Sequence, residues 1–296
     1  MKKEISIKPF QFTGKGKFRI QDAKTKIGDF YEDKAEYEAL MTSFRTEIDA
    51  LQSMMYAHNR YGLLVVFQAM DAAGKDSAIK AVFSGVNPHG VKVSAFKKPS
   101  ETELDHDFLW RTTLTLPERG IISIFNRSYY EEVLVVKVHP EILTKYQKVP
   151  TEFTQNLDKV WEERYEDIAT NEKYLHRNGM SIVKIFLHIS QKEQAARFLE
   201  RIEDETKNWK FAEADLEERK HWKAYMNAYE DAINATATED SPWYIVPADD
   251  KKNARLIISQ IILEHLKKLK INYPVIDEAR QATLQGFVTQ LKKEME

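Results

Sequence analysis

Short apolar runs alternate with stretches of helical periodicity through the middle of the chain. Five of the runs predict strands, at residues 63–67, 91–96, 121–125, 182–189 and 244–246. The stretches between and after them predict helices, at residues 75–83, 102–116, 153–176 and 251–269. Strands that alternate with helices in this way are typical of a parallel sheet with helices on both faces. We therefore predict an α/β fold of three layers around a central parallel sheet.

Three segments fall outside this alternation. The first part of the chain, up to about residue 30, is polar and contains Gly14, Gly16 and Gly28, which predicts a loosely attached arm. An amphipathic helix is predicted at residues 37–56, and the polar tail predicts one more helix. Residues 191–231 are rich in charges at helical spacing and predict a lid. The expected organisation is an arm and helix at 1–57, a core at 58–272 with the lid inserted at about 191–231, and a helical tail at 273–296.

The composition narrows the class of protein. The 296 residues include 44 Lys and Arg, 46 Asp and Glu, and no Cys, so the formal net charge is −2. The absence of Cys excludes disulfides, thiolate metal sites and a Cys nucleophile. A nearly neutral chain argues against a broad nucleic-acid-binding surface. No apolar run approaches the roughly 20 residues of a membrane helix, and no targeting signal is visible, so we expect a cytoplasmic protein without membrane attachment.

The strongest chemical signal lies at residues 67–77, between a predicted strand and a predicted helix. A loop in this position can bind phosphate, because backbone N–H groups and the helix N-terminus face the anion and Lys75 adds a positive charge. The phosphate-loop pattern is met only in part, since Ala69 stands where its first Gly is expected. A plain strand–turn–helix is the alternative. The expected phosphate contacts in the loop are Ala72, Ala73, Gly74, Lys75, Asp76 and Ser77.

The loop contains two carboxylates, those of Asp71 and Asp76, which would ordinarily repel a bound anion. Mg²⁺ typically bridges one or two carboxylates to substrate phosphates. Asp71, with help from Asp76, is therefore the expected Mg²⁺ ligand. For Asp76, simple charge compensation at a helix N-terminus is an equal alternative.

Further polar residues are expected at the same edge of the sheet. A predicted strand ends at Asn126, and Arg127 follows it at the edge where ligands bind in open α/β folds. An Arg there can hold phosphate oxygens in a bidentate fork, although it could instead pair with Glu131 or Glu132. Two further cations, Lys97 and Lys98, follow a predicted strand, and four lie on the predicted lid: Arg197, Arg201, Lys207 and Lys210. Together these side chains could clamp an anion, although each alone could be a solvated side chain.

Six motifs occur in an order that resembles the family 2 polyphosphate kinases, over about residues 63–269. They are AMDAAGKD at 69–76, NPHG at 87–90, HDFLWR at 106–111, FNRSYYE at 125–131, KNWKF at 207–211 and PADDK at 247–251. The resemblance implies a thymidylate-kinase-like P-loop fold with a helical lid. It implies transfer of a phosphoryl group between inorganic polyphosphate and a nucleotide with Mg²⁺, or with Mn²⁺ in its place.

The resemblance also implies roles for single residues. Lys75 and Asp71 match the family's Walker-A Lys and Asp, and Arg127 matches its Walker-B Arg. Tyr130 and Glu131 fall in the same motif as Arg127 and are expected to contact the substrate. Asn126 and Asp76 look like the residues that class III of this family has at these positions. Class III members phosphorylate AMP to ADP and ADP to ATP. GMP and GDP are further candidate acceptors. A homo-oligomer is expected from the resemblance alone.

Two other functions remain open at this point. An ATP-dependent nucleotide or small-molecule kinase would share the P-loop and the lid. A non-catalytic P-loop scaffold is the second alternative, motivated by Ala69 and Asn126. In the polyphosphate hypothesis Lys75 and Arg127 hold the transferring phosphate, Asp71 holds Mg²⁺, and no general base is needed because the acceptor phosphate is already ionised.

Overall fold

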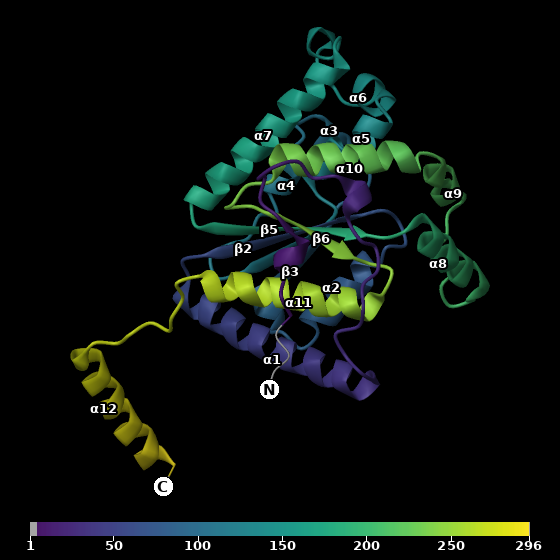
Figure 1. The fold of residues 1–296 in the computed structure, drawn as a ribbon. Coiled ribbons are helices and arrows are strands. Elements are labelled where there is room, and N and C mark those ends of the chain that lie inside the picture. The colour runs from purple at the N-terminus through teal and green to yellow at the C-terminus, as the bar shows by residue number, and fades with distance from the viewer. Residues whose placement is uncertain (1–4, 296) are drawn as a thin grey trace.

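The computed structural model describes residues 5–295, except for the side chain of Lys210. These residues form a six-stranded sheet in the order β1-β6-β5-β2-β4-β3, which Figure 1 shows between two layers of helices. The strands are β1 (Gln11–Phe12), β2 (Gly62–Ala69), β3 (Val91–Ala95), β4 (Ile122–Asn126), β5 (Met180–His188) and β6 (Trp243–Pro247). Five of them are parallel and β1 is antiparallel to β6. The predicted three-layer α/β fold is confirmed.

The hydrophobic core lies on both faces of the sheet. On one face α11 (Lys251–Lys268) packs between the sheet and α1 (Lys34–His58), and α2 (Lys75–Phe83) lies beside α11. On the other face lie α7 (Leu157–Arg177) and α10 (Trp222–Thr236) (Figure 1). All eight residues of β2 are buried, because this central strand is covered on both sides. Its sequence therefore reads as a continuous apolar run instead of an alternating one.

Local capping explains where several helices begin. The Asp33 side chain accepts a hydrogen bond from the Glu36 N–H and starts α1, and Asn59 ends it in a left-handed conformation. Asn156 caps α7 in the same way by accepting from the Lys159 N–H. The helix predicted from residue 153 therefore begins at Leu157, after a short 3-10 turn at Thr151–Phe153.

The helix predicted at residues 102–116 is wrong. The structure has two short helices there, α3 (Glu101–Leu104) and α4 (Trp110–Thr113). Between them the Asp107 side chain accepts a hydrogen bond from the Leu109 N–H at 2.9 Å. Such local bonds compete with a continuous helix, which the apolar spacing alone could not reveal.

The N-terminal segment is not the loosely attached arm that its polar sequence predicts. Ile5 and Ile7 are buried, and β1 pairs with Trp243 and Tyr244 of β6. Further along, the Phe18 N–H donates to Asn234 Oδ1 at 2.8 Å. This segment is ordered by contacts with residues more than 200 positions away, so its own composition carries no signal for it.

The predicted lid is shorter than expected. Its helices are α8 (Gln191–Glu203) and α9 (Glu213–Lys220), joined by a segment that contains a 3-10 turn at Asn208–Lys210. The expected end at residue 231 falls inside α10, which buries Tyr225, Tyr229 and Ile233 and packs on α7. α10 therefore belongs to a core layer.

The remaining helices are short, apart from the last. They are α5 (Val135–Val138), α6 (Glu141–Lys145) and the 3-10 turns at Lys8–Phe10, Ile20–Asp22, Pro88–Gly90 and Tyr129–Glu132. The predicted tail helix is confirmed as α12 (Glu278–Glu294), which stands away from the body of the molecule (Figure 1). Over the described part of the chain, no helix combines the length and the apolar character needed to cross a membrane.

Candidate active site

A cleft of about 770 Å³ opens at the carboxyl end of the parallel strands. It is bounded by the loop between β2 and α2, by the ends of β3 and β4, and by the lid. Most of the residues expected from the sequence line it: Asp71, Ala72, Ala73, Gly74, Lys75, Asp76, Ser77, Lys97, Lys98, Asn126, Arg127, Arg197, Arg201 and Lys207. The parallel register brings these residues together, because every strand then presents its carboxyl end at one edge.

The loop at residues 70–74 has the backbone of an anion site. Gly74 precedes α2 with a φ of 103°, a conformation that favours glycine. Ala72 also has a positive φ, of 59°, which is unusual for a residue with a side chain. Lys75 is the first residue of α2 and donates from Nζ to Ala69 O at 2.9 Å. Burial lowers the pKa of Lys75, although Asp71 opposes the shift.

Arg127 leaves the end of β4 with a φ of 65° and faces two carboxylates. Its Nη2 donates to Asp71 Oδ1 at 2.9 Å, and its Nη1 lies 3.6 Å from Glu131 Oε2. Glu131, followed by Asp71, raises the pKa of Arg127, while burial raises the pKa of Glu131. The alternative pairing with Glu131 is therefore present, and Arg127 lines the cleft as well.

Asn126 and Asp76 also meet across the cleft. Asn126 Nδ2 donates to Asp76 Oδ1 at 2.7 Å. Within residues 5–295, no group of three or more His, Asp or Glu gathers as a metal cage. Asp71 and Asp76 still fit an ion such as Mg²⁺, since that ion often takes only one or two carboxylates and completes its shell with phosphates and water.

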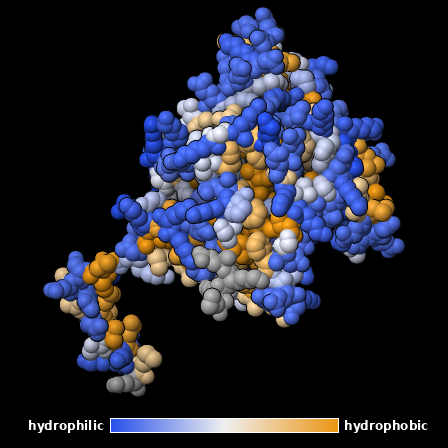
Figure 2. All heavy atoms as spheres, in the orientation of Figure 1, coloured by the Kyte–Doolittle hydropathy of each residue, from blue (hydrophilic) through white to orange (hydrophobic). Residues whose placement is uncertain are grey.

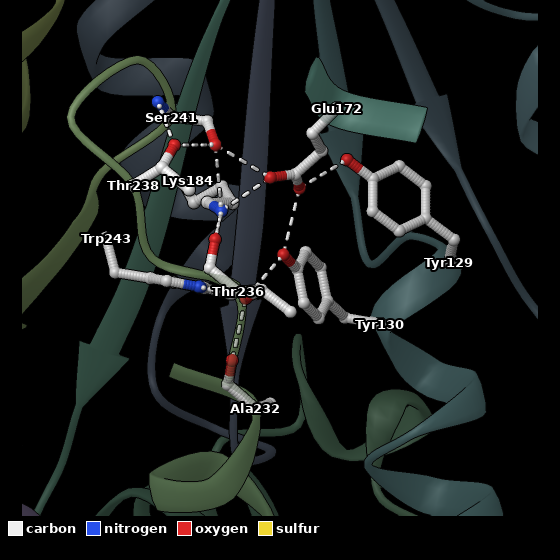
Figure 3. A network of polar contacts seen from close by, with 9 residues as sticks. All are labelled: Tyr129, Tyr130, Glu172, Lys184, Ala232, Thr236, Thr238, Ser241 and Trp243. Carbon is white, nitrogen blue, oxygen red and sulfur yellow. Dashed lines mark hydrogen bonds and ion pairs between the residues drawn. The ribbon is translucent and has the colours of Figure 1, made fainter. Parts of the chain in front are cut away.

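Tyr130 does not reach the cleft, so the expectation that it contacts substrate is wrong in this structure. It is completely buried, and its hydroxyl donates to Glu172 Oε1 at 2.8 Å. Figure 3 shows this hydroxyl and that of Tyr129 meeting Glu172, which also pairs with Lys184 at 2.6 Å. The 3-10 turn after Arg127 aims the two rings into the core, which the motif alone could not indicate. Glu131 lies behind Arg127 and is not part of the cleft wall.

The lid cations have partners within the protein. Arg201 Nη1 lies 3.5 Å from Asp215 Oδ2, and Lys207 pairs with Asp204 at 2.7 Å and with Glu200 at 3.1 Å. Arg197 is only 6% exposed and bonds mainly to backbone carbonyls. The side chain of Lys210 lies outside the described part of the chain.

Several residues of the cleft wall were missed from the sequence. They are Ala95, Phe96, Glu200, Trp209, Asp215 and Lys251. Lys251 could have been found, since it closes the PADDK motif at the start of α11. The sequence contains no signal that marks Asp215 as a cleft residue, because only the fold of the lid brings it near Asp71. Burial, followed by the charge of Asp71, raises the pKa of Asp215.

A phosphate-binding loop under a helical lid, with an Arg at the neighbouring strand end, defines a P-loop phosphotransferase. Comparison with known proteins narrows this class. The chain matches the family described as "Polyphosphate kinase 2 (PPK2)" over residues 31–274. It therefore belongs to the polyphosphate kinase 2 family, and the resemblance drawn from its motifs is confirmed.

Relatives match nearly the whole chain. It is 52% identical over 292 residues to the ADP-polyphosphate phosphotransferase of Rhodopseudomonas palustris, covering 98% of this chain and 100% of that one. It is 41% identical over 275 residues to the AMP/ADP-polyphosphate phosphotransferase of Meiothermus ruber, covering 90% and 97%. The crystal structure of polyphosphate kinase 2 from Arthrobacter aurescens superposes with a TM-score of 0.82 at 34% identity, covering 94% and 95%.

Proposed function

We propose that this protein transfers the terminal phosphoryl group of inorganic polyphosphate to nucleoside mono- and diphosphates, making ADP from AMP and ATP from ADP, in a reversible reaction. The observation that carries the proposal is that Lys75 and Arg127 line the same cleft, in which Arg127 also bonds to Asp71. The names of the relatives, which include both ADP and AMP/ADP phosphotransferases, support the same substrates. GMP and GDP remain further candidate acceptors.

The proposed mechanism needs positioning and charge neutralisation more than covalent chemistry. The transferring phosphoryl group passes through a loose transition state whose charge lies on its outer oxygens. Lys75 and Arg127 would contact those oxygens, and the N–H groups at the start of α2 would hold the neighbouring phosphate. No general base is required, because the attacking phosphate oxygen of the acceptor is already ionised. The lid would exclude water that could hydrolyse the donor.

We propose Mg²⁺ as the cofactor, held by Asp71 and Asp76, with Mn²⁺ as the alternative ion. The ion would neutralise phosphate charge during transfer. This proposal is supported by the two carboxylates in the phosphate loop, which without a cation would repel the substrate. Lys97 and Lys98, at the end of β3, and Arg201 and Lys207, on the lid, are the proposed contacts of the polyphosphate chain.

We propose that the nucleoside of the acceptor occupies a second hollow, of about 340 Å³, beside the cleft. Arg111 connects the two spaces, since it lines the hollow and its Nη2 donates at 2.8 Å to the carbonyl oxygen of Lys97, which lines the cleft. Val149 lies at the exposed rim of this hollow. Val149→Trp should fill it and raise KM for ADP while KM for polyphosphate stays unchanged. Equal effects on the two KM values would refute this placement.

The expected homo-oligomer is proposed to form through α12. This helix buries no residue, and an apolar stripe of Leu284, Phe287, Val288 and Leu291 runs along it, visible as orange in Figure 2. Arg280 and Glu294 stand at opposite ends of the stripe, so two antiparallel copies would bring opposite charges together. Leu291→Asp should reduce the molar mass measured by light scattering.

We expect no nucleic-acid partner and a cytoplasmic location.

A donor test examines the function directly. The purified protein is mixed with Mg²⁺, ADP and long-chain polyphosphate, without ATP, and new ATP is measured by luminescence; AMP is then tested with chromatographic detection. Lys75→Ala should abolish the product, whereas Lys80→Ala, an exposed Lys on the same helix, should not. Transfer only when ATP is supplied would favour an ATP-dependent kinase. No turnover with either donor would favour a non-catalytic scaffold.

A further inference from the structure

The geometry points to a positioning role for the first turns of α8. We propose that Arg197 and Gln194 hold the backbone of the phosphate loop in its anion-binding conformation and that Arg197 does not contact the donor. This inference rests on the proposed function only in taking a polyphosphate as the ligand, and its test measures binding instead of turnover. It differs from the expectation drawn from the sequence, in which Arg197 clamps polyphosphate directly.

Every N–H of the Arg197 guanidinium has a partner within the protein. Nη1 donates to Ala72 O at 3.2 Å and to Ala73 O at 2.8 Å. Nη2 donates to the two carbonyls that follow β6, Ala248 O at 2.6 Å and Asp249 O at 3.0 Å. Nε donates to Glu193 Oε1, one turn earlier on α8, at 2.8 Å. A guanidinium has five N–H groups, so all of them are used.

Gln194 extends the same set of contacts. It is 1% exposed, and its Nε2 donates to Asp71 O at 2.9 Å. Three consecutive carbonyls of the phosphate loop, those of Asp71, Ala72 and Ala73, therefore bond to side chains of α8. Burial of both side chains keeps water from replacing these bonds.

The direction of these carbonyls fixes the direction of the neighbouring N–H groups. In a planar trans peptide, the C=O of one residue and the N–H of the next point in opposite directions. Carbonyls of Asp71 and Ala73 that face α8 therefore turn the N–H groups of Ala72 and Gly74 away from it, toward the cleft that these residues line. The Ala73 N–H closes a turn on Met70 O at 3.3 Å. Holding the carbonyls also keeps their negative ends away from the phosphate.

Arg201 provides the contrast. It lies one turn further along α8, lines the cleft and faces Asp215 across 3.5 Å. A polyphosphate chain could compete with the Asp215 carboxylate for Arg201. It could recruit Arg197 only by breaking bonds to four backbone carbonyls. The two arginines of one helix thus have different roles, and movement of α8 with the lid would be transmitted to the phosphate loop.

Calorimetric titration with tripolyphosphate in Mg²⁺, at several salt concentrations, separates the two roles. The variants are Arg197→Met and Arg201→Met, and the matched control is Lys192→Met, which removes an exposed charge from the same helix. Arg197→Met should weaken binding by about 10- to 100-fold, since small misplacements of binding groups have effects of this order. The slope of log affinity against log salt should stay as in the wild type, because no phosphate contact is lost. In Arg201→Met this slope should fall, as for any polyanion that loses one cationic contact.

Three further readouts complete the test. Guanidinium ions at low millimolar concentration, compared with the same concentration of KCl, should restore binding to Arg197→Met. Arg197→Lys should not restore wild-type affinity, because an ammonium cannot reach four carbonyls at once. If Arg197→Met does not fold by circular dichroism, Gln194→Met removes only the Asp71 carbonyl contact of the loop and should still weaken tripolyphosphate binding.

The proposal would be overturned if Arg197→Met bound tripolyphosphate with wild-type affinity. It would also be overturned if the salt slope of Arg197→Met fell as much as that of Arg201→Met. Wild-type protein that binds tripolyphosphate but does not phosphorylate ADP or AMP would contradict the proposed function alone. The positioning role would then still be decided by the binding data.

Discussion

Arg127 Nη2 donates to Asp71 Oδ1 across 2.9 Å and so ties the end of β4 to the phosphate loop after β2. The two strands are neighbours in register, with Phe67 paired to Asn126, and the Arg127 N–H donates to Phe67 O at 3.1 Å. These bonds hold Arg127 at a φ of 65°, a conformation that costs energy for a residue with a side chain. Asp71 therefore has two proposed tasks: it orients Arg127, and it supplies an oxygen for Mg²⁺.

Asp71→Asn should lower kcat by about 10²- to 10³-fold, the range found when one group that stabilises transition-state charge is removed. The amide keeps the shape of the side chain but loses the charge that attracts Arg127 and Mg²⁺. Steady-state assays over a range of Mg²⁺ concentrations should therefore also show a higher Mg²⁺ requirement. The control is Asp22→Asn, at an exposed position outside the cleft. An unchanged Mg²⁺ requirement would remove Asp71 from the proposed metal site.

Asn126→Asp tests whether the cleft binds a shared cation. The Asn126 amide donates to Asp76 Oδ1 at 2.7 Å, so a carboxylate in its place would face another carboxylate at hydrogen-bond distance. The variant should have a lower melting temperature than the wild type in EDTA, and Mg²⁺ should raise it more than it raises that of the wild type. Asn126→Ala, which lacks the repulsion, is the matched control. If Mg²⁺ shifts both variants equally, Asp76 does not take part in a metal site.

The phosphate loop and its helix could be predicted from the sequence because their determinants are local. A buried strand, a Gly with positive φ and a helix that begins at Lys75 follow one another within a few residues, and the predicted helix 75–83 matches α2 (Lys75–Phe83). The five parallel strands could be predicted for the same reason. Their parallel register then placed Arg127 and Asp71 at one edge without further information.

The parts that could not be predicted depend on contacts between distant segments. β1 has two residues and exists only because β6 pairs with it. Whether Tyr130 faces the cleft or the core depends on the turn after Arg127, and the target of Arg197 depends on how α8 lies against the loop. Residue type and spacing identify such side chains as important but do not give their direction.

The buried pair of Lys184 and Glu172 should behave as a coupled unit in unfolding experiments. Both side chains are completely buried, and Figure 3 shows the hydroxyls of Tyr129, Tyr130 and Ser241 around the carboxylate. Lys184→Met leaves the charge of Glu172 without its partner and should lower the free energy of unfolding by about 3–5 kcal/mol. The double variant Lys184→Met/Glu172→Gln removes both charges and should be less destabilised than the sum of the single variants.

Urea unfolding monitored by circular dichroism measures these differences. Lys145→Met, at an exposed position on α6, provides the control for loss of a Lys. Additive effects in the double variant would mean that the surrounding hydroxyls, and not the ion pair, govern the stability of this network.

His265 should make the protein less stable in mild acid. It is 6% exposed, and burial, followed by the nearby Lys268, lowers its pKa to about 3. In the unfolded chain a His takes up its proton near pH 6.5, so between about pH 6.5 and 3 the unfolded state binds more protons than the folded state. The free energy of unfolding therefore falls as the pH falls through this window. His188, whose pKa burial lowers to about 4, acts in the same direction.

His265→Gln should reduce this pH dependence. Gln cannot take up a proton, and its amide can still bond to the Tyr244 hydroxyl, which lies 2.9 Å from His265 Nε2. Urea unfolding at pH 7, 6 and 5 should show a slope that is smaller than in the wild type by up to one proton, or about 1.4 kcal/mol per pH unit. The exposed His89, replaced by Gln, should leave the slope as in the wild type. Equal slopes for His265→Gln and the wild type would mean that His265 takes up its proton in the folded protein over the same pH range as in the unfolded chain.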